Sequence, residues 1–171
     1  NAGMYTPTNE PEGLYIEEGS KNNYELDTAV LQDLNFYLKP NGVFLIDNKN
    51  TPHIYTTEEY QHLSKSKQIL TKLATQSGPM LVIDGKLHPA FTKNSHNKKI
   101  RSGVGVLSEN KVVFAITLSE SNFYNFSNFF KDVFGCKNVL FLDGAISQMY
   151  LHDLAPNVLG GNFGPMLSVS S

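Results

Sequence analysis

The chain has 171 residues, 40% of them hydrophobic and 18% charged, and its formal net charge is −2. Its pI of about 6.2 argues against the basic surface of a nucleic-acid-binding domain. A lone cysteine, Cys136, excludes an internal disulfide and a cysteine-based zinc site. No run reaches the roughly 18 apolar residues that a membrane span needs. The length suits one domain with a hydrophobic core.

The first half of the chain predicts two strands and one helix. A short strand is expected over residues 13–19. A stronger strand is expected over 41–47, where an Asn-Gly turn signal precedes β-branched and aromatic residues. Thr56 and Glu59 have the spacing of a capping box, which indicates a helix over 57–75. Apolar residues recur along it at roughly helical spacing: Tyr60, Leu63, Ile69, Leu70 and Leu73.

The second half predicts more strands and one aromatic-rich helix. The helix is expected over 121–134, with Gly135 just after its end. The expected strands are 80–83, a hairpin of 103–107 and 111–118, a buried strand over 138–142, and a last strand over 164–171. We therefore predict a single α+β domain over residues 1–171, with a mixed or mostly antiparallel sheet packed with two main helices.

Polar residues and glycines stand at the ends of several predicted strands. Gln76-Ser77-Gly78-Pro79 joins the first helix to a core strand, although turn chemistry alone also explains these residues. Asp143-Gly144 follows the most apolar strand, with Ser147 close behind. Asp143 is either a turn former or a catalytic carboxylate held at a sheet edge.

Arg101 stands out because the other thirteen basic residues are lysines. Its planar guanidinium can grip a carboxylate or phosphate with two parallel hydrogen bonds, which an ammonium group cannot do. The alternative is an exposed surface cation. Arg101 is followed by Ser102 and Gly103, and this glycine lets a ligand or another backbone come close.

Two further patterns concern anions and metals. Asn1-Ala2-Gly3 and Gly160-Gly161-Asn162 are turns whose amides could bind an anion. The five histidines lack the spacing of a metal site, and no metal ligand is assigned among them: His53, His62, His88, His96 and His152.

Taken in order, five segments resemble the phosphodiester glycosidase family. They are residues 1–5 (NAGMY), 41–44 (NGVF), 76–82 (QSGPMLV), 101–105 (RSGVG) and 142–147 (LDGAIS). The resemblance implies hydrolysis of the bond between a sugar's anomeric carbon and a phosphodiester oxygen. It further implies that Arg101 holds the phosphate and Asp143 is the catalytic carboxylate. The implied substrate-binding residues are Ser102, Asn1, Gln76, Ser77, Gly144 and Ser147.

The sequence departs from the family pattern in two places. Ser102 stands where the family commonly has Thr, which keeps the hydroxyl group. Ala145 and Ile146 follow Asp143-Gly144 where the family usually has Gly and a small residue, so a different substrate is expected. This departure keeps open a non-catalytic glycan- or phosphoglycan-binding domain on the same scaffold. A structural envelope protein, with Arg101 and Asp143 far apart and facing solvent, is the third interpretation.

The expected partner is a sugar phosphate or glycan, with no nucleic acid and no membrane span. No cofactor and no metal ligand are predicted, although acidic and Asn residues are numerous enough to allow a divalent metal ion at the phosphate. The resemblance implies an extracytoplasmic location: secreted, periplasmic or at the cell surface. It also places Asn1 in a motif that usually follows earlier strands, so we expect the chain to lack part of the family's N-terminal sheet. The sugar, its linkage and the oligomeric state stay open.

Overall fold

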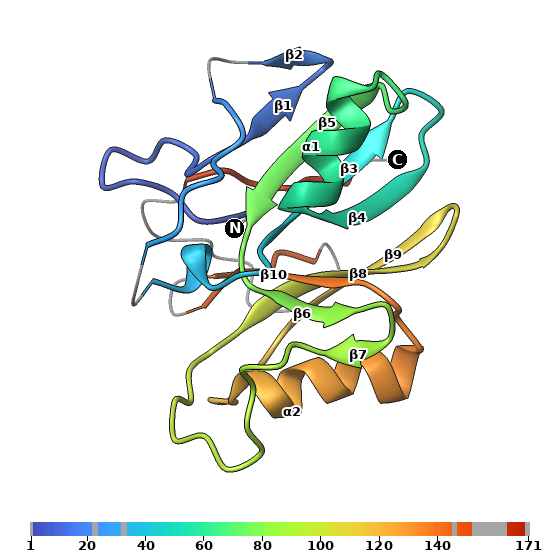
Figure 1. The fold of residues 1–171 in the computed structure, drawn as a ribbon. Helices are drawn as coiled ribbons and strands as arrows, with labels where there is room; N and C mark the ends of the chain where they lie inside the picture. The colour runs from blue at the N-terminus through green and yellow to red at the C-terminus, as the bar shows by residue number, and fades with distance from the viewer. Residues whose placement is uncertain (1, 22–23, 32–33, 145–146, 152–163, 170–171) are drawn as a thin grey trace.

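A computed structural model describes residues 2–21, 24–31, 34–144, 147–151 and 164–169 (Figure 1). The strands are β1 (Tyr15–Glu17), β2 (Ser20–Lys21), β3 (Gly42–Asp47), β4 (Pro52–Thr56), β5 (Thr71–Ser77), β6 (Met80–Ile83), β7 (Lys86–Leu87), β8 (Ser102–Ser108), β9 (Lys111–Ile116) and β10 (Val139–Asp143). The helices are a 3-10 turn η1 (Asn35–Tyr37), α1 (Thr57–Lys65), α2 (Phe123–Asn128) and the π-helical continuation η2 (Phe129–Val133).

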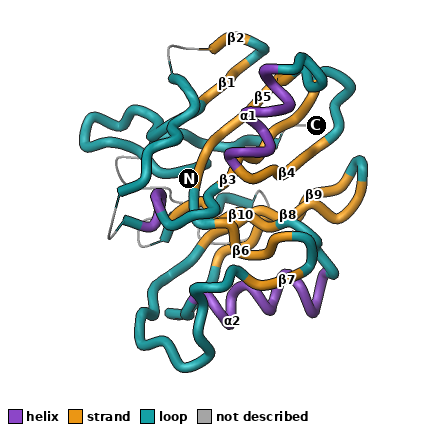
Figure 2. The backbone as a smooth tube through the Cα atoms, viewed as in Figure 1, coloured by secondary structure: helices purple, strands orange, loops and turns teal. Residues whose placement is uncertain are grey.

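The described strands form two sheets, whose paired strands are all antiparallel. The first sheet has the order β2-β1-β5-β3-β4, and the second has the order β7-β6-β10-β8-β9. Helix α1 lies against the first sheet and α2 against the second, at opposite ends of the molecule (Figures 1 and 2). The order of layers is therefore helix, sheet, sheet, helix.

Three apolar clusters fill the spaces between these layers. Successive side chains along β3 point to opposite faces of the sheet, so Val43 and Leu45 pack toward α1 and Phe44 packs toward the second sheet. Strand β10 alternates in the same way, with Leu140 between the sheets and Phe141 toward α2. Both strands are central and buried on both faces, which explains their continuous apolar runs.

The α+β prediction is confirmed, with the strands in two sheets rather than one. The hairpin turn between β8 and β9, the buried strand β10 and the start of α1 lie where the sequence placed them. Thr56 caps α1: its Oγ1 accepts from Glu59 N at 3.2 Å, and Glu59 Oε2 accepts from Thr56 N at 2.8 Å. The prediction missed β4, which follows β3 after a short turn.

Two predicted elements are wrong in extent or type. The helix expected over 57–75 ends at Lys65, and Thr71–Ser77 is strand β5 instead. Lys67 takes a positive φ of 55°, which breaks the helix, and the chain then reverses. No described residue of the expected last strand over 164–171 is in a strand. Pro165 O instead accepts a hydrogen bond from Ala2 N at 2.7 Å.

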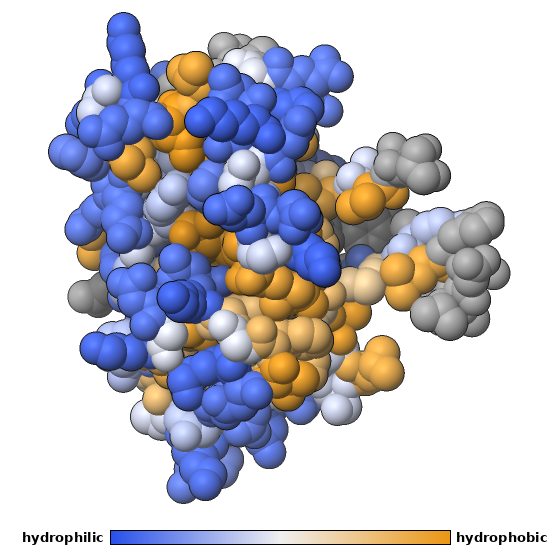
Figure 3. All heavy atoms as spheres, turned by 90° about the vertical axis from the view of Figure 1, so that its right-hand side faces the viewer, coloured by the Kyte–Doolittle hydropathy of each residue, from blue (hydrophilic) through white to orange (hydrophobic). Residues whose placement is uncertain are grey.

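The surface that carries the β8–β9 hairpin is mixed (Figure 3). Hydrophilic side chains cover much of it, and an apolar area lies in its lower half. The layer between the sheets is bordered by half-buried apolar residues: Ile46, Ile83, Val106, Val112 and Phe114. Among the described residues, no helix has the length and hydrophobicity needed to cross a membrane.

Candidate active site

The ends of three strands meet where the two sheets touch. Ser77, the last residue of β5 in the first sheet, is fully buried, and its Oγ donates to Leu142 O of β10 at 3.0 Å. Directly after Ser77, the chain passes through Gly78-Pro79 into β6 of the second sheet. The polar end of β5 is thereby fixed against the end of β10.

A second serine fixes the next residue of β10. Ser102 Oγ, at the start of β8, donates to Asp143 O at 2.9 Å and lies 2.9 Å from Ser147 Oγ. Because the single hydroxyl proton of Ser102 is directed to Asp143 O, Ser147 must be the donor between the two serines. The two serines are nearly buried, each 7% exposed. We call Ser77, Ser102, Asp143 and Ser147 the strand-end junction.

Asp143 is the partly exposed member of this junction. Its Oδ1 accepts from Gly144 N at 2.5 Å, which holds the carboxylate beside the backbone of Gly144. A side chain at Gly144 would lie 2.8 Å from Ile100 O, so the backbone at that position requires glycine. The carboxylate is therefore held at the end of β10 by Gly144 N, on a backbone that Ser102 fixes, and a rigidly held group is suited to catalysis.

Arg101 lies next to the junction but is turned into the protein. It is 1% exposed, and its guanidinium carbon lies 3.6 Å from the centre of the Phe123 ring. Nε donates to Ser121 O at 2.9 Å, and Nη2 donates to Asn97 O at 3.0 Å and to Asn97 Oδ1 at 3.2 Å. Burial lowers its pKa to about 10. The Nε–Nη2 edge that would grip a phosphate is thus occupied by protein oxygens, and the predicted phosphate contact of Arg101 finds no support.

Gln76 is also occupied within the protein. Its Oε1 accepts from Leu14 N at 3.0 Å and Asp27 N at 2.9 Å. Its Nε2 donates to Asp27 O at 2.7 Å and Thr57 Oγ1 at 3.2 Å. The side chain is 1% exposed, so Gln76 ties loops together rather than facing a substrate. Ser77, with its hydroxyl directed to Leu142 O, has a structural role of the same kind.

Other predicted features lie outside the described residues or carry no site. Asn1, the Ala145-Ile146 pair and Gly160-Gly161-Asn162 fall outside the described residues. Within the described part of the chain, no group of three or more His, Cys, Asp or Glu side chains is placed to hold a metal ion. The structural-envelope interpretation placed Arg101 and Asp143 far apart and exposed. Arg101 instead is buried, and its neighbour Ser102 pairs with Asp143.

The model of the phosphodiester glycosidase family matches residues 1–165. The chain belongs to the phosphodiester glycosidase family. Membership supports a hydrolase of the phosphodiester glycosidase type, and it confirms the family resemblance drawn from the sequence motifs.

Two similar proteins align with most of this phosphodiester glycosidase chain but are themselves longer. Uncharacterized protein YigE of Escherichia coli (strain K12) is 34% identical over 151 residues, which are 88% of this chain and 56% of that protein. The catalytic domain of zebrafish N-acetylglucosamine-1-phosphodiester alpha-N-acetylglucosaminidase, auto-inhibited by its pro-peptide, has a TM-score of 0.58 and 17% identity. That alignment covers 86% of this chain and 50% of that structure, and it concerns the fold. The chain therefore spans about half the length of these relatives.

The sequence did not point to one polar group of this phosphodiester glycosidase chain. Lys39, Asn41 and Thr57 lie together beside the end of β5, on the α1 side of the first sheet. The sequence marks Asn41 as part of an Asn-Gly turn signal, yet its side chain is fully buried and its Oδ1 accepts hydrogen bonds from both Lys39 and Thr57. The signal that could have revealed it is an amide directly before a buried strand, where an isolated polar side chain needs partners.

Proposed function

We propose that this chain hydrolyses the bond between the anomeric carbon of a sugar and a phosphodiester oxygen. The observation that carries the proposal is the strand-end junction: in a member of this family, partly exposed Asp143 stands on a backbone fixed by Ser77 and Ser102. Glycoside hydrolysis canonically uses a pair of carboxyl groups, and Asp143 supplies a carboxylate at a fixed position.

The chemistry follows from the phosphate leaving group. The bond between the anomeric carbon and the bridging oxygen breaks, and its electron pair leaves with the phosphate monoester. This oxygen is weakly basic, so protonation by a second carboxylic acid is less necessary than for an ordinary glycoside. Asp143 stabilises the positive charge that develops on the sugar and accepts a proton from the attacking water, whose oxygen adds to the anomeric carbon.

The surrounding residues keep Asp143 in place for this step. Ser102 Oγ donates to the Asp143 carbonyl, Ser147 Oγ hydrogen-bonds Ser102 Oγ, and Gly144 N donates to the Asp143 carboxylate. Arg101 acts as a positioning residue, because its guanidinium stacks near both Phe123 and Phe141 of β10, at 3.6 Å and 5.6 Å from the ring centres. This role replaces the direct phosphate grip expected from the sequence.

Sugar release from nucleotide sugars and aryl sugar phosphodiesters tests the proposal. The wild-type chain should release free sugar, and Asp143→Asn should lower turnover by about 100-fold or more, because the neutral amide can neither accept the proton nor stabilise the charge. Asp132→Asn, an exposed carboxylate on η2, is the matched control and should keep full turnover. Equal melting temperatures would show that both variants are folded.

The possible outcomes separate the alternatives. A wild-type chain that binds these compounds but releases no sugar would be a glycan-binding domain, and the hydrolase proposal would be wrong. Release that is unchanged in Asp143→Asn would remove this residue from the mechanism. The extracytoplasmic location and the lack of a cofactor stay predictions.

A further inference from the structure

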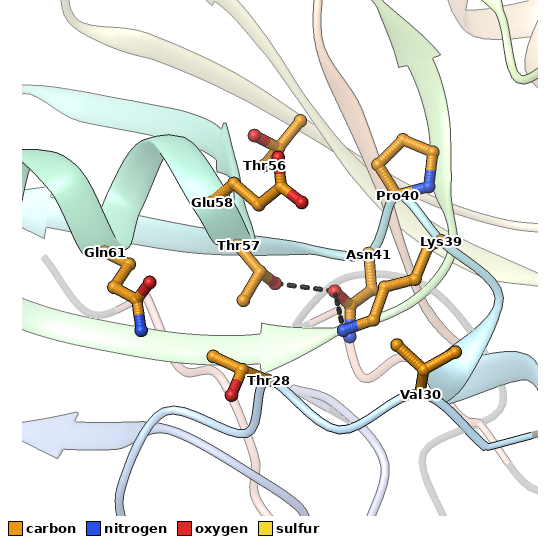
Figure 4. Close-up of a pocket in the computed structure, with 9 residues that line it drawn as sticks. All are labelled: Thr28, Val30, Lys39, Pro40, Asn41, Thr56, Thr57, Glu58 and Gln61. Carbon is orange, nitrogen blue, oxygen red and sulfur yellow. Dashed lines mark hydrogen bonds between the residues drawn. The ribbon is translucent and has the colours of Figure 1, made fainter.

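A hollow of about 490 Å³ lies on the α1 side of the first sheet (Figure 4). Three segments surround it: the loop at Thr28 and Val30, the loop at 39–41, and the first turns of α1. Its volume falls within the range of sites that bind small molecules. The lining residues are Thr28, Val30, Lys39, Pro40, Asn41, Thr56, Thr57, Glu58 and Gln61.

Lys39 supplies a cation to this hollow. Its Nζ donates to Asn41 Oδ1 at 3.0 Å. Among the residues that the structure describes, no carboxylate lies within 4.0 Å of this Nζ. Burial lowers the pKa of Lys39, and the more distant Asp27 and Glu58 partly oppose this effect. A half-buried ammonium group in this position favours an anionic ligand group beside it.

The floor of the hollow is fixed by buried hydrogen bonds. Asn41 Oδ1 also accepts from Thr57 Oγ1 at 2.6 Å, and Asn41 Nδ2 donates to Phe36 O at 2.9 Å. Thr57 Oγ1 in turn accepts from Gln76 Nε2 at 3.2 Å. The three polar side chains Asn41, Thr57 and Gln76 are each 4% exposed or less. The network holds Lys39 Nζ at one side of the hollow before any ligand binds, which lowers the entropy cost of binding.

The opposite side of the hollow offers neutral and acidic groups. Glu58 and Gln61 project from α1, and Thr28 lies below them (Figure 4). Carboxylate, amide and hydroxyl groups pair with the hydroxyls of a sugar. Glu58 would repel a second negative charge, so a ligand with one anionic end fits better than one with two.

We propose that this hollow binds a sugar bearing one anionic group, with its negative oxygens at Lys39 and its hydroxyls toward Glu58 and Gln61. The hollow lies across β5 from the strand-end junction, because Gln76 points toward α1 and Ser77 toward the second sheet. Binding here is therefore separate from hydrolysis at Asp143. A phosphate and a carboxylate are two sources of the same anionic chemistry, and the probes below distinguish them.

Calorimetric titration of the whole chain tests this site. The probes are glucose 1-phosphate and glucuronate, with glucose and inorganic phosphate as probes that each lack one feature. We expect at least one anionic sugar to bind about tenfold more tightly than glucose or inorganic phosphate. Glucose lacks the contacts of the anionic group, and inorganic phosphate lacks the contacts of the sugar hydroxyls. Tighter binding of glucose 1-phosphate or of glucuronate shows whether the anionic group is a phosphate or a carboxylate.

Variants locate the binding. Lys39→Met should weaken binding of that anionic sugar about tenfold, whereas Lys39→Arg keeps the charge and should retain most of the affinity. Lys65→Met, on the exposed end of α1, is the matched control and should bind as the wild type does. Asp143→Asn should also bind normally, so loss of hydrolysis and loss of this site are distinguishable. Equal melting temperatures would confirm that the variants are folded.

Three results would overturn the proposal. The wild-type chain could bind no probe, whether or not it hydrolyses phosphodiesters. Lys39→Met could bind as tightly as the wild type. Binding could be lost in Asp143→Asn and kept in Lys39→Met, which would move the ligand to the strand-end junction.

Discussion

The Arg101 guanidinium carbon lies 3.6 Å from the centre of the Phe123 ring, so the one arginine of the chain is stacked on α2 inside the protein. Three hydrogen bonds from Nε and Nη2 join this side chain to Asn97 and Ser121. Arg101 thus connects the start of β8 to two loops and to the second helix. The composition singled out this residue for phosphate binding, and its surroundings give it a role in stability.

Arg101→Lys should therefore destabilise the fold. The ammonium group of lysine cannot stack flat on Phe123 or reach both acceptors in the same fork geometry. We expect the free energy of unfolding in urea to fall by about 1.5–3 kcal/mol, the range for a hydrogen bond to a charged group. A direct phosphate role would give the opposite pattern, with stability unchanged and the KM for a phosphodiester raised.

Gln76→Leu should also lower stability, because it removes all four hydrogen bonds made by the side-chain amide. Leu14 N and Asp27 N then lose their acceptor, and a buried unpaired donor costs about 1–3 kcal/mol. Urea denaturation measures the change. The exposed residue Gln68 provides the matched control, since Gln68→Leu should change stability by less than about 0.5 kcal/mol. Gln76→Leu with wild-type stability would contradict the assigned role.

His88 should make stability depend on pH. Its Nδ1 accepts from Ala90 N at 3.2 Å, so the proton is on Nε2, which donates to Lys39 O at 2.9 Å. Burial lowers the pKa of His88 below its usual 6.5. As the pH falls below 6.5, the unfolded chain binds a proton that the folded chain refuses, so the free energy of unfolding decreases. Above that pH the contribution of His88 is complete.

Denaturation at about pH 7.5 and pH 5.5 measures this effect of His88, within the range in which histidine titrates. His88→Gln keeps a side-chain donor but does not titrate, and it should reduce the loss of stability between the two pH values. His62→Gln, on the exposed side of α1, should leave that loss unchanged. The same loss in His88→Gln and in the wild type would show that another group is responsible.

The sequence predicted elements well where a local signal marks both ends. The capping box located the start of α1, but Leu73 fits helical spacing and lies in strand β5, and Ile69 lies in the segment before that strand. The break at Lys67 has no glycine or proline to mark it, so the predicted helix ran on to residue 75. The strand expected over 164–171 failed because its apolar residues face outward, with Val169 90% exposed.

The candidate site was partly predictable for a similar reason. Ser102, Asp143 and Ser147 were selected at strand ends, and the structure brings them together. The partners of Arg101 and Gln76 are mainly backbone groups, which any residue type supplies. Sequence alone therefore could not reveal that these side chains are occupied inside the protein.

The strand-end junction draws its members from both sheets. Ser77 belongs to the first sheet, whereas Ser102 and Asp143 belong to the second. A fragment of the chain that contained one sheet would lack part of this arrangement, however well its own strands paired. Separation of the two sheets would remove the support of Leu142 O by Ser77 before either sheet unfolded. The proposed catalytic centre therefore depends on contact between the two sheets. During unfolding, activity should disappear as soon as the sheets separate.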